Sequence, residues 1–186
     1  MSLKHGLLGL LNYGSMTGYE LDKAFRDSLS FFWQAKTSQI YRELDAMENC
    51  GWLTSHRVIQ NEKPNKRVYS LTASGKAELS NWLAAADGDI ADAMRVKSAF
   101  LMRVFFAGET SIEQALAMLH AYRKQCQKSR EALTAVHAVS SDYSTKIGDE
   151  QKSQFWQLSI LYGESFYDAS LAWADKAISI LEEKSK

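Results

Sequence analysis

The sequence predicts a mainly α-helical chain of two domains, with a single β-hairpin in the first. Apolar residues recur at helical spacing through most of the 186 residues, and only the stretch 54–71 alternates with period two. Residues 84–92, rich in Ala, Asp and Gly, separate the two parts. We therefore expect a first domain over residues 3–83 and an all-helical second domain over residues 90–184.

Two helices are expected at the start of the first domain. Residues 3–12 carry a face of leucines and end at the break Tyr13-Gly14-Ser15. Thr17 and Glu20 have the spacing of a capping box, in which each side chain satisfies the free backbone N–H of the other residue. A second helix is therefore expected to begin at this point.

A third helix carries the clearest core pattern of the first domain. Ile40, Leu44 and Met47 are spaced by four and three residues, which predicts one buried face. Gly51 follows as a candidate C-terminal cap, because glycine readily adopts the left-handed conformation that ends many helices.

The hairpin comes next in the chain. Period-two alternation predicts strands over residues 54–60 and 66–71, joined by a turn at residues 61–65. Thr72 then has the position of an N-cap, so a fourth helix is expected after the hairpin.

Only helices are expected in the second domain. Residues 96–106 are a short apolar segment, and a longer helix begins near Thr110. Its apolar residues follow the alternating spacing of a coiled-coil seam, namely Ile112, Ala115, Leu119, Tyr122, Cys126, Leu133 and Val136. The last helix, roughly residues 151–183, carries a stripe formed by Phe155, Leu158, Tyr162, Phe166, Ala169, Trp173 and Ile180. Further apolar residues lie on its other faces, so this helix is expected to pack on more than one neighbour.

Three short helices followed by a hairpin are the element order of a winged helix-turn-helix. In that fold the third helix enters the DNA major groove and the hairpin contacts the flanking backbone. Polar side chains at the start of the third helix suit this use, because Gln can bond adenine, Arg can bond guanine or phosphate, and free N–H groups can hold a phosphate oxygen. The candidates are Lys36, Thr37, Ser38, Gln39 and Arg42. The alternative is that these residues are only solvated.

The charge of the chain limits how DNA could be bound. The sequence has 22 basic and 22 acidic residues and a formal net charge of zero, so a local patch would have to meet the phosphates. Lys63, Lys66 and Arg67 provide such a patch at or beside the turn, where Glu62 is the only acid. A chance cluster of three cations is the alternative.

Three segments of the first domain carry a family resemblance. They are "GLLGLLNYGSMTGYEL", "FFWQAKTSQIYRELDAMENCGWL" and "NKRVYSLTASGKAEL", and they cover nearly all of residues 5–83. Together they resemble the PadR transcriptional regulators. The second half, with "FWQLSILYGESFYDASLAWADKAI" near its end, is similar in layout to the larger PadR subclass, which has a virulence-activator-like helical C-terminal domain.

The resemblance implies a bacterial, cytoplasmic homodimer that binds double-stranded DNA and usually represses transcription. It also implies that Tyr41 and Arg42 contact DNA and that residues 63–67 belong to the wing. For Tyr41 the alternative is a ring packed on the second helix. A dimer is favoured independently, because one winged helix reads few base pairs whereas a symmetric pair matches a palindromic operator.

The number of available cations predicts a salt dependence. Each protomer offers six cations, which are Lys36, Arg42, Arg57, Lys63, Lys66 and Arg67. If about half of the resulting twelve touch phosphates, the logarithm of the affinity falls with the logarithm of the salt concentration at a slope of roughly −5.

Aromatic residues of the second domain are candidates for an effector site. They could line an apolar cavity for a small aromatic effector, such as the phenolic acids that some PadR proteins sense. The candidates are Phe100, Phe105, Tyr122, Trp156, Tyr162, Phe166 and Trp173. The alternative is that these rings form the core and the dimer seam.

Enzyme chemistry is not indicated. The four histidines are scattered without ligand spacing, and no nucleophile elbow or phosphate-cradling glycine loop is present, so we expect no catalytic residue, metal or cofactor. Cys50 and Cys126 form no framework, which suits a reducing cytoplasm, and no apolar run approaches the length of a membrane span. The competing hypothesis is a helical dimeric protein-interaction module that does not bind DNA.

Overall fold

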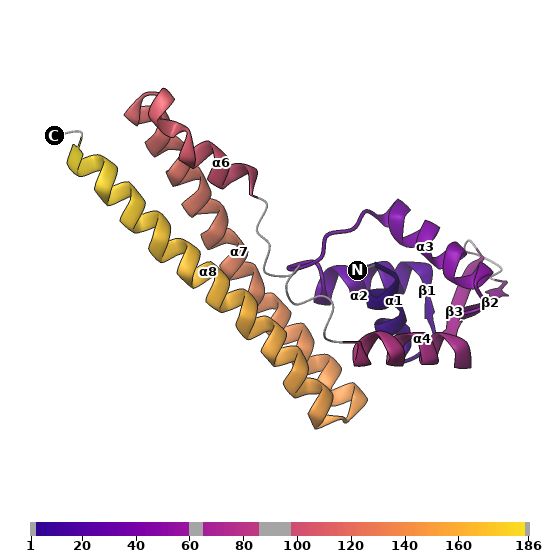
Figure 1. The fold of residues 1–186 in the computed structure, drawn as a ribbon. Coiled ribbons are helices and arrows are strands. Elements are labelled where there is room, and N and C mark those ends of the chain that lie inside the picture. The colour runs from indigo at the N-terminus through magenta and orange to yellow at the C-terminus, as the bar shows by residue number, and fades with distance from the viewer. Residues whose placement is uncertain (1–2, 60–64, 86–97, 185–186) are drawn as a thin grey trace. The chain divides into compact units, whose positions relative to one another are not determined.

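The structure is a computed structural model that describes residues 3–59, 65–85 and 98–184 (Figure 1). The chain divides into two compact units, Met1–Asp92 and Ala93–Lys186. The first unit contains α1 (Leu3–Leu11), β1 (Met16–Thr17), α2 (Gly18–Ser28), α3 (Thr37–Asn49), β2 (Leu53–Val58), β3 (Lys66–Leu71) and α4 (Ala73–Ala84). The second contains α6 (Ala99–Phe105), a short 3₁₀ helix (Ala107–Glu109), α7 (Ile112–Ile147) and α8 (Glu150–Lys184). The predicted fold class, a mainly helical chain with a winged helix-turn-helix, is confirmed.

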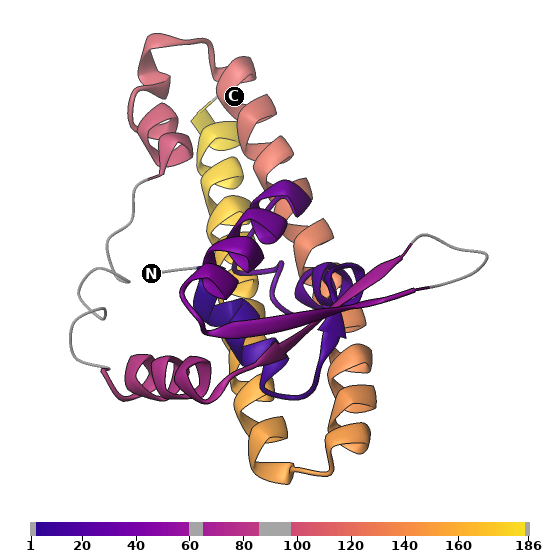
Figure 2. The ribbon, with the colours of Figure 1, turned by 90° about the vertical axis from the view of Figure 1, so that its right-hand side faces the viewer.

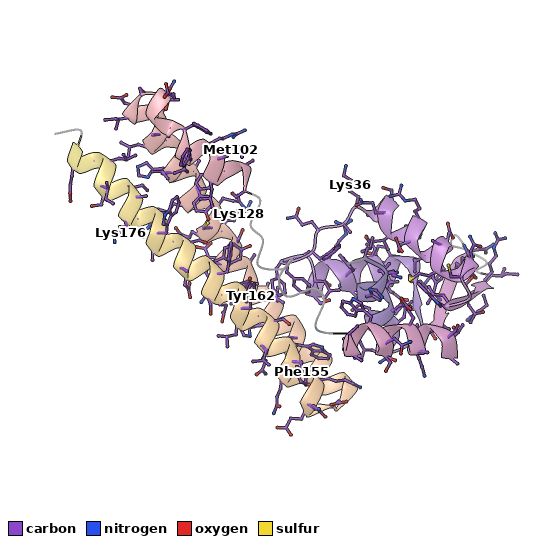
Figure 3. All side chains as sticks on the ribbon, in the orientation of Figure 1. Lys36, Met102, Lys128, Phe155, Tyr162 and Lys176 are labelled. Atoms are coloured by element: carbon purple, nitrogen blue, oxygen red, sulfur yellow. The ribbon has the colours of Figure 1, made fainter. Side chains whose placement is uncertain are left out.

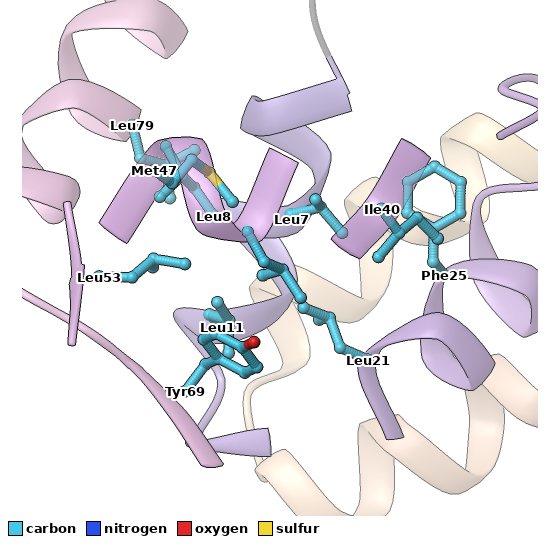
Figure 4. Packing of buried hydrophobic residues seen from close by; sticks show 11 residues of the cluster. Leu7, Leu8, Leu11, Leu21, Phe25, Ile40, Met47, Leu53, Tyr69 and Leu79 are labelled. Carbon is cyan, nitrogen blue, oxygen red and sulfur yellow. The ribbon is translucent and has the colours of Figure 1, made fainter. Parts of the chain in front are cut away.

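One hydrophobic core holds the first unit together (Figure 4). The predicted face of α3 is correct, because Ile40, Leu44 and Met47 are all buried. Their neighbours in the core come from α1, α2 and α4 and from both long strands, and are Leu7, Leu8, Leu11, Leu21, Phe25, Leu53, Tyr69 and Leu79. This shared core fixes α3 and the hairpin in one rigid arrangement.

A three-stranded antiparallel sheet of order β1-β3-β2 contains the predicted hairpin. In β2 and β3, Ser55 lies opposite Tyr69 and Arg57 lies opposite Arg67. Figure 2 shows the two strands projecting as an arm from the helices of their unit. We call β2, β3 and the turn between them the wing. The short strand β1, which pairs Met16 with Tyr69, was not predicted.

The helix ends follow the predicted capping chemistry. The Thr17 backbone N–H donates to Glu20 Oε2 at 2.8 Å, and the Glu20 N–H donates to Thr17 Oγ1 at 3.2 Å, which completes the capping box of α2. Gly51 follows α3 with a φ of 75°, in the left-handed region that favours glycine. Thr72 Oγ1 accepts a hydrogen bond from the Gly75 N–H at 3.1 Å and caps α4.

In the second unit, α7 and α8 lie side by side as an antiparallel pair (Figures 1 and 2). The predicted seam of α7 is buried at Ala115, Leu119, Cys126 and Leu133. Ion pairs flank it, among them Arg130 Nη1 to Glu164 Oε1 at 3.0 Å and Arg130 Nε to Asp168 Oδ1 at 2.8 Å. Within the described residues, no helix is both long and apolar enough to cross a membrane.

The stripe predicted on α8 is present but is exposed rather than buried against α7; of its residues, Trp173 also meets Tyr122 of α7 edge-on. The residues of α8 that are buried are instead Ser153, Ile160, Gly163, Ala174 and Ile178. Phe155 is 61% exposed, Tyr162 72% and Phe166 53%. Figure 3 labels Phe155 and Tyr162 on α8. We call the seven residues of this exposed surface the outer stripe, namely Phe155, Leu158, Tyr162, Phe166, Ala169, Trp173 and Ile180.

Candidate nucleic-acid interface

The helix α3 has three sides with different surroundings. One side is the buried face described above, and a second carries Asp45 and Glu48 toward the wing. The third side is exposed, and we call it the reading face; it consists of Lys36, Ser38, Gln39 and Arg42. Figure 3 shows Lys36 projecting from the start of α3. The fold therefore leaves these four polar residues, which the sequence predicts as DNA contacts, exposed on the surface of the first unit.

Two of the candidate residues at the start of α3 are also held by local hydrogen bonds. The Lys36 backbone N–H donates to Gln39 Oε1 at 2.8 Å, which leaves the amide NH₂ of Gln39 as its group for an outside acceptor. Thr37 Oγ1 accepts from Arg26 Nη2 at 2.6 Å and donates to Asp22 Oδ2 at 3.4 Å. Thr37 thus fastens α3 to α2.

The ring of Tyr41 packs against the start of α2. A Cβ placed on Gly18 would lie 2.6 Å from Tyr41 Cε1, so the ring occupies the space that a side chain at Gly18 would need. The ring is still 41% exposed. Of the two interpretations of Tyr41, packing on the second helix is therefore visible in the structure, and contact with DNA stays a prediction.

The wing presents its cations in two different ways. Lys66 is exposed at the outer end of β3, whereas Arg67 is bound to residues of α3 and β2. Arg67 Nη1 donates to Asp45 Oδ1 at 3.1 Å, Nη2 donates to Glu48 Oε2, and Nε donates to Ser55 Oγ at 2.7 Å. Lys63, the third predicted cation, lies outside the described residues.

The surroundings of Arg67 keep it charged. Burial by itself lowers the pKa of Arg67, but the neighbouring Tyr69, Glu48 and Asp45 together raise it above its ordinary value. The guanidinium also lies over the Tyr69 ring, 5.2 Å from the ring centroid.

The sequence did not predict that Asp45 and Glu48 bind Arg67. Their one available signal was the spacing of three residues, which places two acids on one side of α3.

Three of the seven candidate effector residues come together in the second unit. Phe100 stacks on Tyr122 with ring centroids 4.0 Å apart, and Trp173 meets Phe100 edge-on at 6.0 Å and Tyr122 at 5.7 Å. We call these three residues the ring cluster. Burial raises the pKa of the Tyr122 hydroxyl, although a hydrogen bond with Ser170 opposes it.

The other four candidates lie outside the ring cluster. Phe105 is 81% exposed and meets Phe106 edge-on at 5.0 Å. Tyr162 and Phe166 belong to the outer stripe of α8, and Trp156 is half-buried. The structure therefore does not gather all seven rings at one place.

A helix-turn-helix with a hairpin wing, and with an exposed basic face on its third helix, defines the class of winged-helix DNA-binding regulators. The model of the PadR-like transcriptional regulator family matches residues 7–81, and that of the virulence activator alpha C-terminal region matches residues 96–182. The chain is 36% identical over 132 residues to the negative transcriptional regulator PadR of Bacillus subtilis, covering 71% of this chain and 69% of that protein. The chain belongs to the PadR family, and it is a transcriptional regulator rather than an enzyme.

Solved structures agree with this assignment. The crystal structure of Bacillus subtilis PadR in complex with operator DNA matches with a TM-score of 0.78 and 26% identity, covering 96% of this chain and 98% of that one. The same protein in complex with p-coumaric acid matches with a TM-score of 0.71 and 23% identity, covering 97% of this chain and 98% of that one. The second match shows a shared fold.

Proposed function

We propose that this chain is a cytoplasmic repressor that binds a palindromic operator as a homodimer and is released by a small aromatic or phenolic effector. One observation carries the DNA-binding part. Lys36 and Arg42 stand exposed at the reading face, and neither forms an ion pair within the described residues. Arg42 is thus free to meet a base edge or a phosphate. The relative from Bacillus subtilis is a negative regulator solved with operator DNA, which supports repression.

The outer stripe of α8 supports the homodimer. An exposed apolar surface of this length is costly to leave in water, and it marks an interaction site in most proteins. A second copy of the chain is the natural occupant, because a symmetric pair of wings and reading faces matches a palindromic operator.

The effector part rests on the relative and on the ring cluster. Bacillus subtilis PadR has been solved with p-coumaric acid, a flat phenolic ring. Aromatic rings attract one another in stacked and edge-on arrangements, and in this chain Phe100 stacks on Tyr122 while Trp173 meets both rings edge-on. We propose that a phenolic effector binds at the ring cluster, next to the half-buried Tyr122 hydroxyl.

A selection from random double-stranded DNA tests operator binding. We expect the wild-type chain to enrich a palindrome whose half-sites lie about one helical turn apart. Arg42→Ala is expected to change the preferred bases, and Lys66→Ala to weaken all sequences alike. Lys128→Ala, a cation of α7 in the second unit, is the matched control and leaves the selection unchanged. If the wild type enriches no sequence, the interaction-module hypothesis replaces this one.

A thermal-shift screen with phenolic acids tests the effector. A binding acid raises the melting temperature of the protein and lowers its affinity for the selected operator. Tyr122→Phe keeps the ring but removes the hydroxyl, and it is expected to weaken the response to phenolic acids. A broad panel of acids that gives no stabilisation would indicate a repressor without this effector class.

A further inference from the structure

Two arginines of the wing face each other but have different surroundings. Arg57 of β2 lies directly opposite Arg67 of β3, so both side chains leave the same face of the hairpin. All three guanidinium nitrogens of Arg67 donate hydrogen bonds to other side chains of the first unit. Arg57 is exposed, and in the part of the chain that the structure describes it has no ion-pair partner. Sequence alone counts both arginines among the cations available to DNA phosphates, whereas in the structure their surroundings differ.

The contacts of Arg67 form a closed network. Its Nε, Nη1 and Nη2 atoms donate to Ser55, Asp45 and Glu48. Ser55 Oγ in turn donates to Glu48 Oε1 at 2.7 Å. The planar guanidinium suits such a fork of acceptors, and a partner with a different shape would not satisfy all three. The network connects β3 to both α3 and β2.

Breaking this network to reach DNA is unfavourable. If Arg67 turned to a phosphate, it would give up these bonds and leave Asp45 and Glu48 without their cation. Both carboxylates belong to the helix that is expected to approach the DNA, and a phosphate near two unpaired acids is repelled. The opposite residue, Arg57, can meet a phosphate without losing a partner.

We infer that Arg67 is a positioning residue, which fixes the wing against α3 through Asp45 and Glu48, and that Arg57 is the phosphate contact at this level of the wing. The inference rests on the proposed operator binding. It changes the role expected from the cluster of cations around the turn, in which Arg67 was a phosphate contact and Arg57 was not included.

The salt dependence of operator affinity separates the two roles. Arg57→Ala is expected to reduce the slope of log affinity against log salt by about 0.9 for each chain bound, because one fewer phosphate is neutralised. Arg67→Ala is expected to lower the affinity about tenfold with an unchanged slope, because a loosened wing must be ordered on binding while its phosphate contacts remain the same. Arg57→Lys keeps the charge and is the matched control with an unchanged slope.

The partners of Arg67 provide a second measurement. In a chain carrying Asp45→Asn and Glu48→Gln, Arg67→Ala is expected to cost less than about twofold in operator affinity, because the network is already lost. An equal cost in both backgrounds, or a slope reduced by Arg67→Ala as much as by Arg57→Ala, overturns the inference.

Urea unfolding tests the positioning role of Arg67 without DNA. Arg67→Ala and the pair Asp45→Asn with Glu48→Gln are expected to shift the unfolding midpoint by amounts that do not add. Additive shifts overturn the network. If the wild type bound no DNA, the proposed function and the role of Arg57 would both be wrong, whereas this cycle would still decide whether Arg67 holds the wing.

Discussion

At two glycines of the first unit, an added Cβ would come closer than 3.0 Å to a neighbouring residue. A Cβ on Gly75 would lie 2.2 Å from the Trp52 carbonyl oxygen and 2.8 Å from Leu71 Cδ1. A Cβ on Gly18 would meet the ring of Tyr41 at 2.6 Å. The two obstacles differ, because the Trp52 carbonyl is backbone while the Tyr41 ring is a partly exposed side chain that can turn away.

Gly75→Ala is expected to destabilise the first unit strongly. The Trp52 carbonyl also accepts a hydrogen bond from the Thr72 backbone N–H at 3.0 Å, so it cannot move without breaking that contact. We expect a loss of about 3 kcal/mol in the free energy of unfolding, the upper range for overpacking. Urea denaturation measures it. Gly9→Ala, where no atom lies within 4 Å, is the control and costs nothing; a Gly75→Ala protein of wild-type stability would contradict the close approach.

Gly18→Ala is expected to cost less, about 1 kcal/mol, because the Tyr41 ring can rotate. The cost arises from contact with the Tyr41 ring, so Tyr41→Ala should remove it. The double variant should therefore lose less unfolding free energy than the two single variants lose in total. Thermal unfolding of the four proteins checks this pair. Additive effects would show that Tyr41 and Gly18 do not share that space in solution.

At the scale of elements, the start of α2 should respond to pH. The pKa of Glu20 is lowered from its ordinary value of 4.5, first by the backbone N–H of Thr17 and then by the Thr17 hydroxyl. A lowered folded-state pKa means that the charged form is favoured by folding. This stabilisation is therefore fully present above the pKa of the unfolded chain and is lost as the pH falls through the folded-state pKa.

Glu20→Gln is expected to lose this acid-dependent part of the stability. The difference in unfolding free energy between wild type and variant should be greatest near neutral pH and should shrink toward zero below about pH 3. Urea unfolding at a series of pH values measures it. Thr17→Ala removes only the hydrogen bonds of the Thr17 hydroxyl and keeps the one that the backbone N–H donates to Glu20, so it should reduce the pH-dependent difference without abolishing it. A difference that stays constant from pH 7 to below about pH 3 would exclude the carboxylate as its source.

Local patterns explain which elements the sequence could predict. The capping box of Thr17 and Glu20 and the buried face of α3 each depend on residues within a few positions of one another. The strand β1 could not be predicted in this way, because it has two residues and pairs with Tyr69 and Val68, more than fifty residues further along the chain. The hydrogen-bond partners of Arg67 could not be predicted for the same reason, because they too lie far from Arg67 along the chain.

The orientation of α8 was also beyond prediction from the sequence. Periodicity shows that apolar residues share a side of a helix, but it does not say which neighbour covers that side. In α8 the small residues Gly163 and Ala174 lie buried in the unit, while the large aromatic residues form the outer stripe. Small residues allow two helices to approach closely. The periodicity of apolar residues does not distinguish small side chains from large ones, so it could not predict which side of α8 packs in the unit.

For the whole molecule, the outer stripe predicts the oligomeric state. Tyr162→Glu combined with Phe166→Glu places two charges on the stripe, and we expect it to convert a dimer into a folded monomer. Light scattering after size-exclusion chromatography measures the mass, and circular dichroism checks the fold. Gln157→Glu adds a charge at an exposed polar position of the same helix and is expected to remain dimeric.

The same variant should reveal how much of the DNA affinity depends on pairing. A monomer neutralises half as many phosphates as a dimer, so its slope of log affinity against log salt is expected to be about half that of the wild type. A wild-type chain that is already monomeric, or a double variant that stays dimeric, would show that the outer stripe is not the seam between two copies.

The three sides of α3 have a consequence for how such a regulator changes its target. The residues that pack the core and those that face the wing are distinct from Ser38, Gln39 and Arg42 on the reading face. Of these three, only Gln39 contributes to holding the helix in place, through the Lys36 N–H. Substitutions at Ser38 and Arg42 can therefore redirect the protein to a new operator at little cost in stability, so new specificity can evolve on an unchanged scaffold.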